Sequence, residues 1–543
     1  MCGIFGVVDM EGVGREDITH FRTILEGLTH RGPDARSLDT TRRALFGHAL
    51  LSIVGDGERQ PLFNELRTII LVCNGEIFNH VSLRNHLEER GHRFSTHSDC
   101  EVILHLYETY GEALFDHIEG FYSFALWDEE EGRLLLARDH AGRKPLFYHV
   151  ENNRILFSSD IRSIVRYTGK RFEVNTRLIK EYLAMGFFPS PHTVYRSIFK
   201  LRPSQFLLRT KGGMWSRNHS IHVGRLMSPP SAKEFYSVLK DATRKRLSSE
   251  WGNGVLLSGG LDSTCILHCS CQPGKPPSAY SVNVEHDSEQ RFQHMAAHSC
   301  DARSYEVDFK KKEILDIPHF VHRLTEPVGN PVFLPLLKLA QEAQKNIRIL
   351  LTGDGADELF AGYDHYHGVF QGSMTGLSTL RRNHMRHHMR YYDPLFPDGR
   401  GLRYEMFMDF MFFLGDYIMP VVDSASMAYS LETRHPFLDK EVISLSHALG
   451  TDELICNDQG KHVIREAFRD TLPEAIIRRG KQGFNIPLEN AYGLIPDEFV
   501  NTFSHEIGMR ESKLKQLKRR VVDPTYHYRL GVLIHWLHSV HRG

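Results

Sequence analysis

The sequence predicts an α/β protein of two domains, and three observations carry this prediction. Its 543 residues exceed what one hydrophobic core usually organises, and 41% hydrophobic content suffices for two cores. Up to about residue 175, short apolar strands bounded by turns predominate. From residue 233 onward, helical segments alternate with apolar strands, which is typical of a parallel, doubly wound sheet.

The elements follow in order along the chain. In the first part we expect helices at 18–28 and 81–89 and strands at 120–128, 133–138 and 146–150. The polar stretch that contains Gly212-Gly213 and Pro229-Pro230 predicts a connection at 201–230 between domains at 2–200 and 231–543. In the second part, apolar strands are expected at 255–257, 279–284 and 347–352.

Composition narrows the class of protein. The formal net charge of −1 gives no general attraction to nucleic acid or to an anionic membrane. The eight cysteines lack paired zinc-finger spacing, and no secretory leader or transmembrane run is visible, which predicts a cytoplasmic protein with reduced thiols. We interpret Cys265, Cys269 and Cys271 as residues that pack a helix rather than as ligands of a soft metal. We interpret the His/Arg-rich tract 381–392 as a solvated basic helix rather than as an anion or metal site.

The second residue, Cys2, is a candidate nucleophile. Removal of Met1 would leave a thiol and a free α-amino group on one residue. A thiolate attacks carbonyl carbons well, and an α-amine titrates near neutral pH, so Cys2 could be nucleophile and base at once. This predicts amide hydrolysis through a thioester, although an early cysteine by itself is also compatible with chance.

Three further motifs follow Cys2 within the first hundred residues. They are His30-Arg31-Gly32-Pro33-Asp34, Cys73-Asn74-Gly75-Glu76 and Ser98-Asp99-Cys100-Glu101. With these motifs the chain resembles glutamine amidotransferases of class II, whose glutaminase is an N-terminal-nucleophile domain with an α/β/β/α sandwich. The resemblance implies that Arg31 shapes the glutamine pocket, that Asn74 and the Gly75 amide stabilise an oxyanion, and that Glu76 and Asp99 bind the ammonium group of glutamine.

Two glycine-rich loops mark the second part. An apolar strand leads into Ser258-Gly259-Gly260-Leu261-Asp262-Ser263 and then into a helical pattern, an arrangement that suits a phosphate group. The lysine of the common nucleotide loop is absent. A second strand leads into Thr352-Gly353-Asp354-Gly355-Ala356-Asp357, and the carboxylates of Asp262 and Asp357 suit Mg²⁺.

Further motifs extend the resemblance to the asparagine synthetase family, with its ATP-pyrophosphatase synthetase domain, as far as about residue 484. They are 422–428, 431–439 and Arg479-Gly480-Lys481-Gln482-Gly483. The resemblance implies that ATP is bound by Leu257, Ser258, Gly259, Gly260, Asp262, Ser263, Val282, Thr352 and Gly353. It places Asp354, Glu432 and Arg434 in the acceptor and adenylate region and gives Lys481 the role of neutralising phosphate charge.

One departure concerns the glutamine pocket. Gly47-His48-Ala49-Leu50 aligns with a family segment whose arginine would clamp the glutamine carboxylate, and here that position is Leu50. Loss of that arginine is expected to weaken glutamine binding unless Arg59 or Arg31 substitutes for it. Asp354 and Asn330 are smaller departures from the family pattern, and they leave the identity of the acceptor open.

The expected activity is an ATP-dependent amidotransferase. Cys2 would release ammonia from glutamine, the second domain would adenylate a carboxylate, and ammonia would cross a sheltered, apolar passage to form the amide. Aspartate is the simplest acceptor; a sugar acid or a biosynthetic intermediate is the alternative. Two other functions are less favoured by the sequence. An amide-forming cyclase would not need Cys2, and a non-catalytic sensor of glutamine or a nucleotide would not need intact glycine-rich loops. A homodimer is compatible with the sequence.

Overall fold

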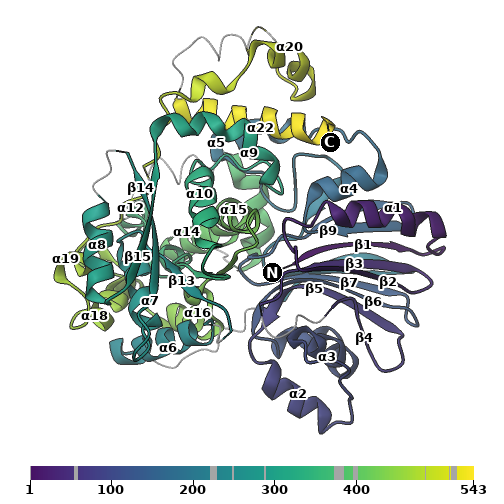
Figure 1. Ribbon diagram of the computed structural model, residues 1–543, viewed down its shortest axis with the longest axis horizontal. Coiled ribbons are helices and arrows are strands. Elements are labelled where there is room, and N and C mark those ends of the chain that lie inside the picture. Colours follow the sequence, from purple (N-terminus) through teal and green to yellow (C-terminus); the bar gives the residue numbers. More distant parts are fainter. Residues whose placement is uncertain are drawn as a thin grey trace.

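Two domains lie side by side, and the chain begins where they meet (Figure 1). The computed structural model describes residues 2–53, 59–219, 229–247, 250–285, 289–371, 384–395, 401–483, 485–510, 512, 514 and 523–542. The predicted fold class is confirmed, with antiparallel sheets in the first domain and a parallel sheet in the second.

The first domain stacks two six-stranded antiparallel sheets between two helical layers (Figure 1). One sheet contains β10 (Ile198–Lys200), β8 (Phe147–Glu151), β9 (Arg154–Ser158), β1 (Gly3–Asp9), β3 (Ala44–Leu50) and β2 (Ala35–Thr40), in that order. The other contains β12 (Gly213–Asn218), β11 (Gln205–Thr210), β7 (Arg133–Arg138), β6 (Gly120–Asp128), β5 (Ile69–Ile77) and β4 (Leu62–Phe63). The helices α1 (Arg15–Glu26) and α4 (Ile161–Thr168) cover the first sheet, and α2 (His80–Glu88) and α3 (Val102–Tyr110) cover the second.

Alternating side chains explain this sandwich. Ile4 on β1 and Phe46 on β3 face Val72 on β5 and Leu136 on β7, and all four are buried in the layer between the sheets. The opposite face of each sheet packs against its helices. Because both faces of each central strand are covered, the strands appear in the sequence as nearly continuous apolar runs.

The segment 201–230 differs from the expected connection. Within it, β11 pairs with β7, and β12 pairs with β11, at the edge of the second sheet. Phe206, Leu207 and Leu208 are buried there. The glycines and the polar residues at 210–218 mark a hairpin rather than a linker, since an edge strand needs only one apolar face. Residues 220–228 lie outside the described part of the chain.

The second domain is built on a five-stranded parallel sheet. Its order is β15 (Arg303–Phe309), β14 (Ser278–Val284), β13 (Asn253–Leu256), β16 (Ile349–Leu351) and β17 (Glu432–Arg434). The strand order reverses between β13 and β16, and ligands of such sheets bind at the carboxyl ends of the strands at this switch point. The two glycine-rich loops follow β13 and β16, so the fold places both of them there.

Helices surround this sheet. The longer ones are α6 (Ala232–Arg244), α7 (Leu261–Ser270), α8 (Gln290–Ser299), α10 (Phe333–Ala343), the π-helix η7 (Asp409–Ile418), α15 (Met419–Met427), α16 (Lys440–Ala448), α20 (Asp497–Glu506) and α22 (Pro524–Arg542). Shorter elements are α5 (Ile179–Met185), α9 (Ile317–Phe320), α11 (Ala356–Leu359), α12 (Asp364–Phe370), α14 (Leu402–Met408), α17 (Thr451–Leu454), β18 (Ile455–Cys456), β19 (Gln459–Gly460), α18 (His462–Phe468) and α19 (Glu474–Ile477). Among the helices of the described residues, none has both the length and the hydrophobicity to cross a bilayer.

Candidate active sites

Cys2 and Asn74 come together from the two stacked sheets. Cys2 immediately precedes β1, and its backbone N–H donates to Oδ1 of Asn74 on β5 at 3.0 Å. Asn74 is fully buried, and its Nδ2 has no hydrogen-bond partner within the described residues. A buried N–H group without an acceptor is costly, so Asn74 Nδ2 is a donor available to a ligand oxygen beside Cys2.

The backbone at Gly75 admits no side chain. A Cβ at this position would lie 2.2 Å from the carbonyl oxygen of Phe121 on the neighbouring strand β6. Glycine therefore allows β5 and β6 to pair closely beside Asn74. This is the physical reason for the Asn74-Gly75 pair, which the sequence alone also permits as a turn.

Burial governs the state of the Cys2 thiol. The side chain is almost completely enclosed, and this desolvation raises the pKa of the thiol above its ordinary value. The resting thiol is therefore protonated near neutral pH, and attack on a carbonyl needs a base close by. An α-amino group on the same residue meets that need once Met1 is removed.

Two carboxylates lie beyond Asn74. Burial raises the pKa of Glu76 to about 8, against the opposing effect of Arg434, and burial also raises the pKa of Asp99. Asp99 Oδ2 accepts the N–H of Ile77 at 2.6 Å, which holds it next to the end of β5. Buried carboxylates that lack enough positive charge are suited to receive a cationic group such as the ammonium of an amino acid.

Arg31 does not face an open pocket. Its Nη2 lies 2.8 Å from Oδ2 of Asp423 on α15, and its Nε donates to the carbonyl oxygen of Cys2 at 3.4 Å. Arg31 is fully buried, so in this structure it supports the backbone of Cys2 and joins the two domains. An acidic partner from the second domain thus engages the guanidinium group, and the role of Arg31 in shaping the glutamine pocket stays a prediction.

Leu50 ends β3 beside the same site. Its side chain is buried, and the backbone of the next residue, Leu51, is hydrogen-bonded to the Cys2 thiol. The backbone at this position therefore runs next to the nucleophile, and the buried side chain carries no charge. Arg59, the suggested substitute, is exposed.

The first glycine-rich loop joins β13 to α7. Ser263 Oγ accepts the N–H of Ser258 at 3.3 Å and lies 3.1 Å from Ser258 Oγ, which closes the turn. Gly259 has a φ of +76°, and a Cβ there would lie 2.7 Å from the backbone nitrogen of Gln293. Backbone N–H groups and hydroxyls at the N-terminus of a ten-residue helix form a suitable cradle for phosphate.

Two lysines and two aspartates form a charge cluster at the switch point. Lys461 Nζ lies 2.6 Å from Asp262 Oδ2 and 2.5 Å from Asp357 Oδ1, and Lys481 Nζ lies 2.7 Å from Asp357 Oδ2. Burial alone would raise the pKa of Asp357, but the two lysines hold it below the ordinary value. Burial would likewise lower the pKa of Lys481, but Asp357 and Asp262 keep it above the ordinary value. Both groups are charged at neutral pH.

Asp262, Lys461 and Lys481 of this cluster line a cavity of about 310 Å³, which is large enough for part of a nucleotide. Its walls include Ser258, Gly260, Asp262, Lys461, Arg479 and Lys481. Asp262 Oδ1 is buried without a hydrogen-bond partner among the described residues. This oxygen and the carboxylate of Asp357 fit Mg²⁺, which prefers oxygen ligands and accompanies ATP.

The other predicted nucleotide residues surround the same loops. Leu257 and Val282 are buried at the ends of β13 and β14, and a Cβ on Gly353 would lie 3.0 Å from Cβ of Asp262. The two glycine-rich loops are thus in contact. The Thr352 hydroxyl lies 2.7 Å from Asp354 Oδ2 and 2.8 Å from His435 Nδ1.

Glu432 and Arg434, expected near the acceptor, lie between the two sites. The Arg434 guanidinium pairs with Glu76 in the Cys2 pocket and with Glu432 at 2.6 Å. The Arg434 carbonyl oxygen accepts the N–H of Thr352 in the second glycine-rich loop at 3.0 Å. One strand, β17, therefore touches both sites, and the contact is buried but charged rather than apolar.

Sequence reasoning missed Lys461. It is the N-cap residue that precedes α18, with a φ of +61°. Gly362 leaves the space that the Lys461 side chain fills, since a Cβ on Gly362 would lie 2.1 Å from Lys461 Cε. The sequence predicts no separate role for Arg479, although it belongs to the last motif. In the structure it pairs with Glu289 and donates to the Gly259 carbonyl oxygen at 2.9 Å. The sequence signal for Lys461, a Gly-Lys pair before a helix, is too common to be specific.

Comparison with known proteins assigns a family model to each part of the chain. A glutamine amidotransferase domain model matches residues 1–220, and an asparagine synthase model matches residues 234–529. Asparagine synthetase [glutamine-hydrolyzing] 1 of Bacillus subtilis (strain 168) is 26% identical over 93% of this chain and 90% of its own length. Asparagine synthetase B [glutamine-hydrolyzing] of Escherichia coli (strain K12) is 27% identical over 89% of this chain and 82% of its own length. Both models match in order along one chain, and relatives of that name cover most of it, so this protein belongs to the glutamine-hydrolysing asparagine synthetase family.

Proposed function

We propose that the protein makes asparagine from aspartate, with glutamine as the nitrogen donor and ATP as the source of energy. The observation that carries this proposal is the position of Arg434, which pairs with Glu76 beside Cys2 and holds Thr352 of the second glycine-rich loop. A residue that touches both sites supports two half-reactions that run in sequence within one molecule. The printed names of the relatives support aspartate as the acceptor.

In the first half-reaction, the Cys2 sulfur forms a bond to the side-chain amide carbon of glutamine. The thiol proton passes to the α-amine of Cys2 and then to the departing nitrogen, which leaves as ammonia. Asn74 Nδ2 and the Gly75 N–H stabilise the intermediate oxyanion, and Glu76 and Asp99 bind the substrate ammonium group. Water then cleaves the thioester and releases glutamate.

In the second half-reaction, a carboxylate oxygen of the acceptor attacks the α-phosphorus of ATP and pyrophosphate leaves. Ammonia then attacks the carbonyl carbon of the adenylate, and AMP leaves as the amide forms. Lys481 and Lys461 balance the phosphate charge, and the loop from Ser258 to Ser263 donates N–H groups to it. Asp262 and Asp357 would hold Mg²⁺, which supplies further charge neutralisation.

The test is pyrophosphate release with Mg²⁺-ATP and aspartate, with either glutamine or ammonium, and identification of the amide by mass. Asparagine formed from both nitrogen sources supports the full proposal. Asparagine formed from ammonium alone means that the glutaminase is impaired, as Leu50 predicts. If pyrophosphate release requires another carboxylate, that carboxylate replaces aspartate as the acceptor. If no carboxylate supports pyrophosphate release, a non-catalytic sensor is favoured. A homodimer and a cytoplasmic location stay predictions of the sequence.

A further inference from the structure

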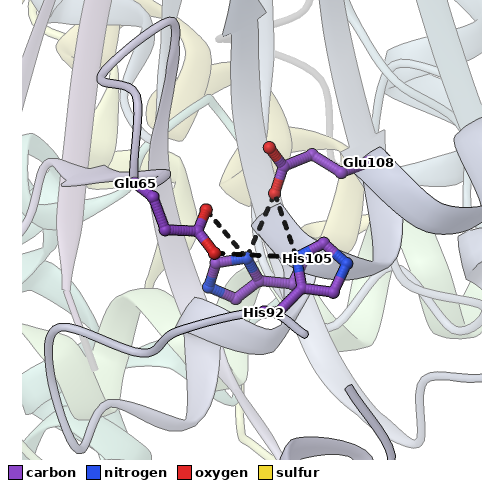
Figure 2. A group of neighbouring side chains, drawn as sticks. All are labelled: Glu65, His92, His105 and Glu108. Carbon is purple, nitrogen blue, oxygen red and sulfur yellow. Dashed lines mark hydrogen bonds and ion pairs between the residues drawn. The ribbon is translucent and has the colours of Figure 1, made fainter. Parts of the chain in front are cut away.

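Four metal-ligating side chains converge on one point in the first domain, far along the chain from Cys2. Figure 2 shows Glu65, His92, His105 and Glu108 pointing toward one another. One ligand atom from each side chain lies within 4.8 Å of all the others. They come from three segments: the turn between β4 and β5, the loop after α2, and helix α3. Neither proposed half-reaction uses any of them.

The spacing of the ligand atoms fits a tetrahedral ion. Nδ1 of His105 lies 3.1 Å from Glu108 Oε2 and 3.7 Å from Glu65 Oε2. Nδ1 of His92 lies 3.6 Å from Glu108 Oε2 and 3.8 Å from Glu65 Oε1. Zinc bonds of 2.0–2.1 Å in a tetrahedron place neighbouring ligand atoms about 3.3 Å apart; these four pairs lie at 3.1–3.8 Å, and all the ligand atoms lie within 4.8 Å of one another.

The surrounding contacts fix which nitrogen of His92 faces the centre. The Thr109 hydroxyl donates its one proton to the carbonyl oxygen of His105 at 2.8 Å. It must therefore accept from His92 Nε2, which lies 2.9 Å away. With the proton on Nε2, the lone pair of neutral His92 is on Nδ1, the atom that points at the cluster.

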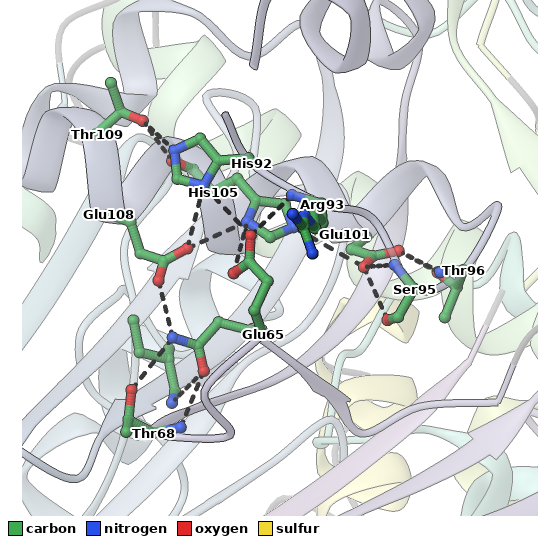
Figure 3. A network of polar contacts seen from close by, with 12 residues as sticks. Glu65, Thr68, His92, Arg93, Ser95, Thr96, Glu101, His105, Glu108 and Thr109 are labelled. Carbon is green, nitrogen blue, oxygen red and sulfur yellow. Dashed lines mark hydrogen bonds and ion pairs between the residues drawn. The ribbon is translucent and has the colours of Figure 1, made fainter. Parts of the chain in front are cut away.

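The other three ligands are also held from outside (Figure 3). His105 Nε2 faces Glu101 Oε1 at 3.8 Å, and the Glu101 carboxylate accepts four hydrogen bonds from Ser95 and Thr96, at 2.5–2.9 Å. Glu108 Oε1 accepts from Asn64 Nδ2 at 2.8 Å, and Glu65 Oε1 accepts from the backbone N–H of Arg93 at 2.8 Å. A carboxylate behind a ligating histidine and donors behind ligating carboxylates are the usual outer contacts of a protein metal site.

We propose that Glu65, His92, His105 and Glu108 bind one zinc ion. The two imidazole nitrogens favour a transition metal over calcium or magnesium, and two nitrogens with two carboxylate oxygens in a tetrahedron suit zinc. Four protein ligands leave no open position, so the ion has a structural role. It ties the β4–β5 turn to the first residues after α2 and to α3, whose preceding turn contains Asp99.

The first test is the zinc content of the intact protein, measured by elemental analysis after treatment with a chelator, addition of one equivalent of zinc and dialysis. The proposal predicts one zinc ion per chain, a Kd below about 1 µM, and a rise in melting temperature of about 5 °C on zinc binding. Cobalt in place of zinc should give the visible absorption of a tetrahedral site.

The variant Glu65→Gln/His92→Gln alters the two ligands from loops, which are partly exposed, and leaves the buried His105 in place. It should retain less than about 0.1 zinc per chain and lose the cobalt absorption. The matched control His294→Gln removes one member of an exposed His–Glu pair on α8, 2.6 Å from Glu306, and should bind zinc like the wild type.

Two results would overturn the proposal. They are a wild-type protein that retains no zinc under these conditions, and a double variant that retains as much zinc as the wild type. In the first case the four side chains are an ordinary hydrogen-bonded charge network. Neither result bears on the proposed amidotransferase activity, because the readouts are metal content, absorption and melting temperature rather than turnover.

Discussion

The Cys2 pocket and the nucleotide cavity differ in how their surroundings shift the pKa values of buried groups. Around Cys2, burial raises the pKa values of the thiol, of Glu76 and of Asp99, so the pocket favours neutral groups when it is empty. At the cavity, Lys461 and Lys481 hold the pKa of Asp357 below its ordinary value, so Asp357 is charged, while burial raises the pKa of Asp262. The first environment suits a neutral amide, and the second suits a polyphosphate with its metal ion.

Under the proposed mechanism, this difference gives a physical reason for the two half-reactions to occupy separate domains. Burial keeps the Cys2 thiol protonated in its pocket, and the charges of a polyphosphate and its metal ion would be costly in the same desolvated surroundings. The strand β17 joins the two environments through a single residue, Arg434.

The strongest test of this separation is Cys2→Ala. We expect glutamine hydrolysis to fall at least about 10⁴-fold, because no other group replaces the nucleophile. Pyrophosphate release supported by ammonium should stay within about twofold of the wild type, since the cavity is untouched. The control Cys271→Ser alters a partly exposed thiol of the second domain and should change neither rate. Loss of both activities in Cys2→Ala would show that the sites are not separable.

The second test concerns Arg434, the residue shared by both sites. Arg434→Met leaves Glu76 and Glu432 buried without their partner, which is expected to lower the free energy of unfolding by about 3–5 kcal/mol. The control Arg478→Met removes an exposed partner of Glu474 and should cost less than about 1 kcal/mol. Urea unfolding measures both values. Equal stability of the two variants would contradict the assigned role of Arg434.

The third test separates the cavity from the pocket. Lys481→Met removes a cation 2.7 Å from Asp357 and should lower pyrophosphate release by about 10²–10³-fold. Glutamine hydrolysis measured without ATP should be unchanged. The surface variant Lys312→Met is the control for loss of a positive charge. A glutaminase defect in Lys481→Met of similar size would mean that the two sites share their charge balance.

The fourth test uses pH. Because burial raises the pKa of the Cys2 thiol, the thiol stays protonated at neutral pH and the rate depends on the neutral fraction of its base. We expect kcat/KM for glutamine hydrolysis to rise about tenfold per pH unit below the α-amine pKa, near 8, and then to level off. A rate that is flat between pH 6 and 8 would indicate a thiolate that is already formed.

The smallest expected effect concerns Leu50. An arginine at this position would place a guanidinium group beside the pocket, and Leu50→Arg should lower the KM for glutamine by about tenfold. Leu50→Met keeps the apolar surface and serves as the control. If the KM is the same in both variants, the glutamine carboxylate is bound elsewhere in the pocket.

The sequence located most elements because their patterns are local. The strand at 133–138 matches β7, and the strand at 120–128 matches β6. Helices expected at 18–28 and 81–89 are α1 (Arg15–Glu26) and α2 (His80–Glu88), shifted toward the N-terminus by one to three residues. The hairpin of β11 and β12 was missed because one face of an edge strand is polar, which resembles a linker in composition.

By itself the sequence determined the order of the domains, the family, Cys2 as the candidate nucleophile and the two glycine-rich loops, since each depends on residues adjacent along the chain. Only the tertiary structure decided which charges meet. It paired Arg31 with Asp423, placed Lys461 between Asp262 and Asp357, and gathered Glu65, His92, His105 and Glu108 around one point. Ion pairing acts over a few ångströms of space whatever the distance along the chain, so one sequence without its fold does not reveal these partners.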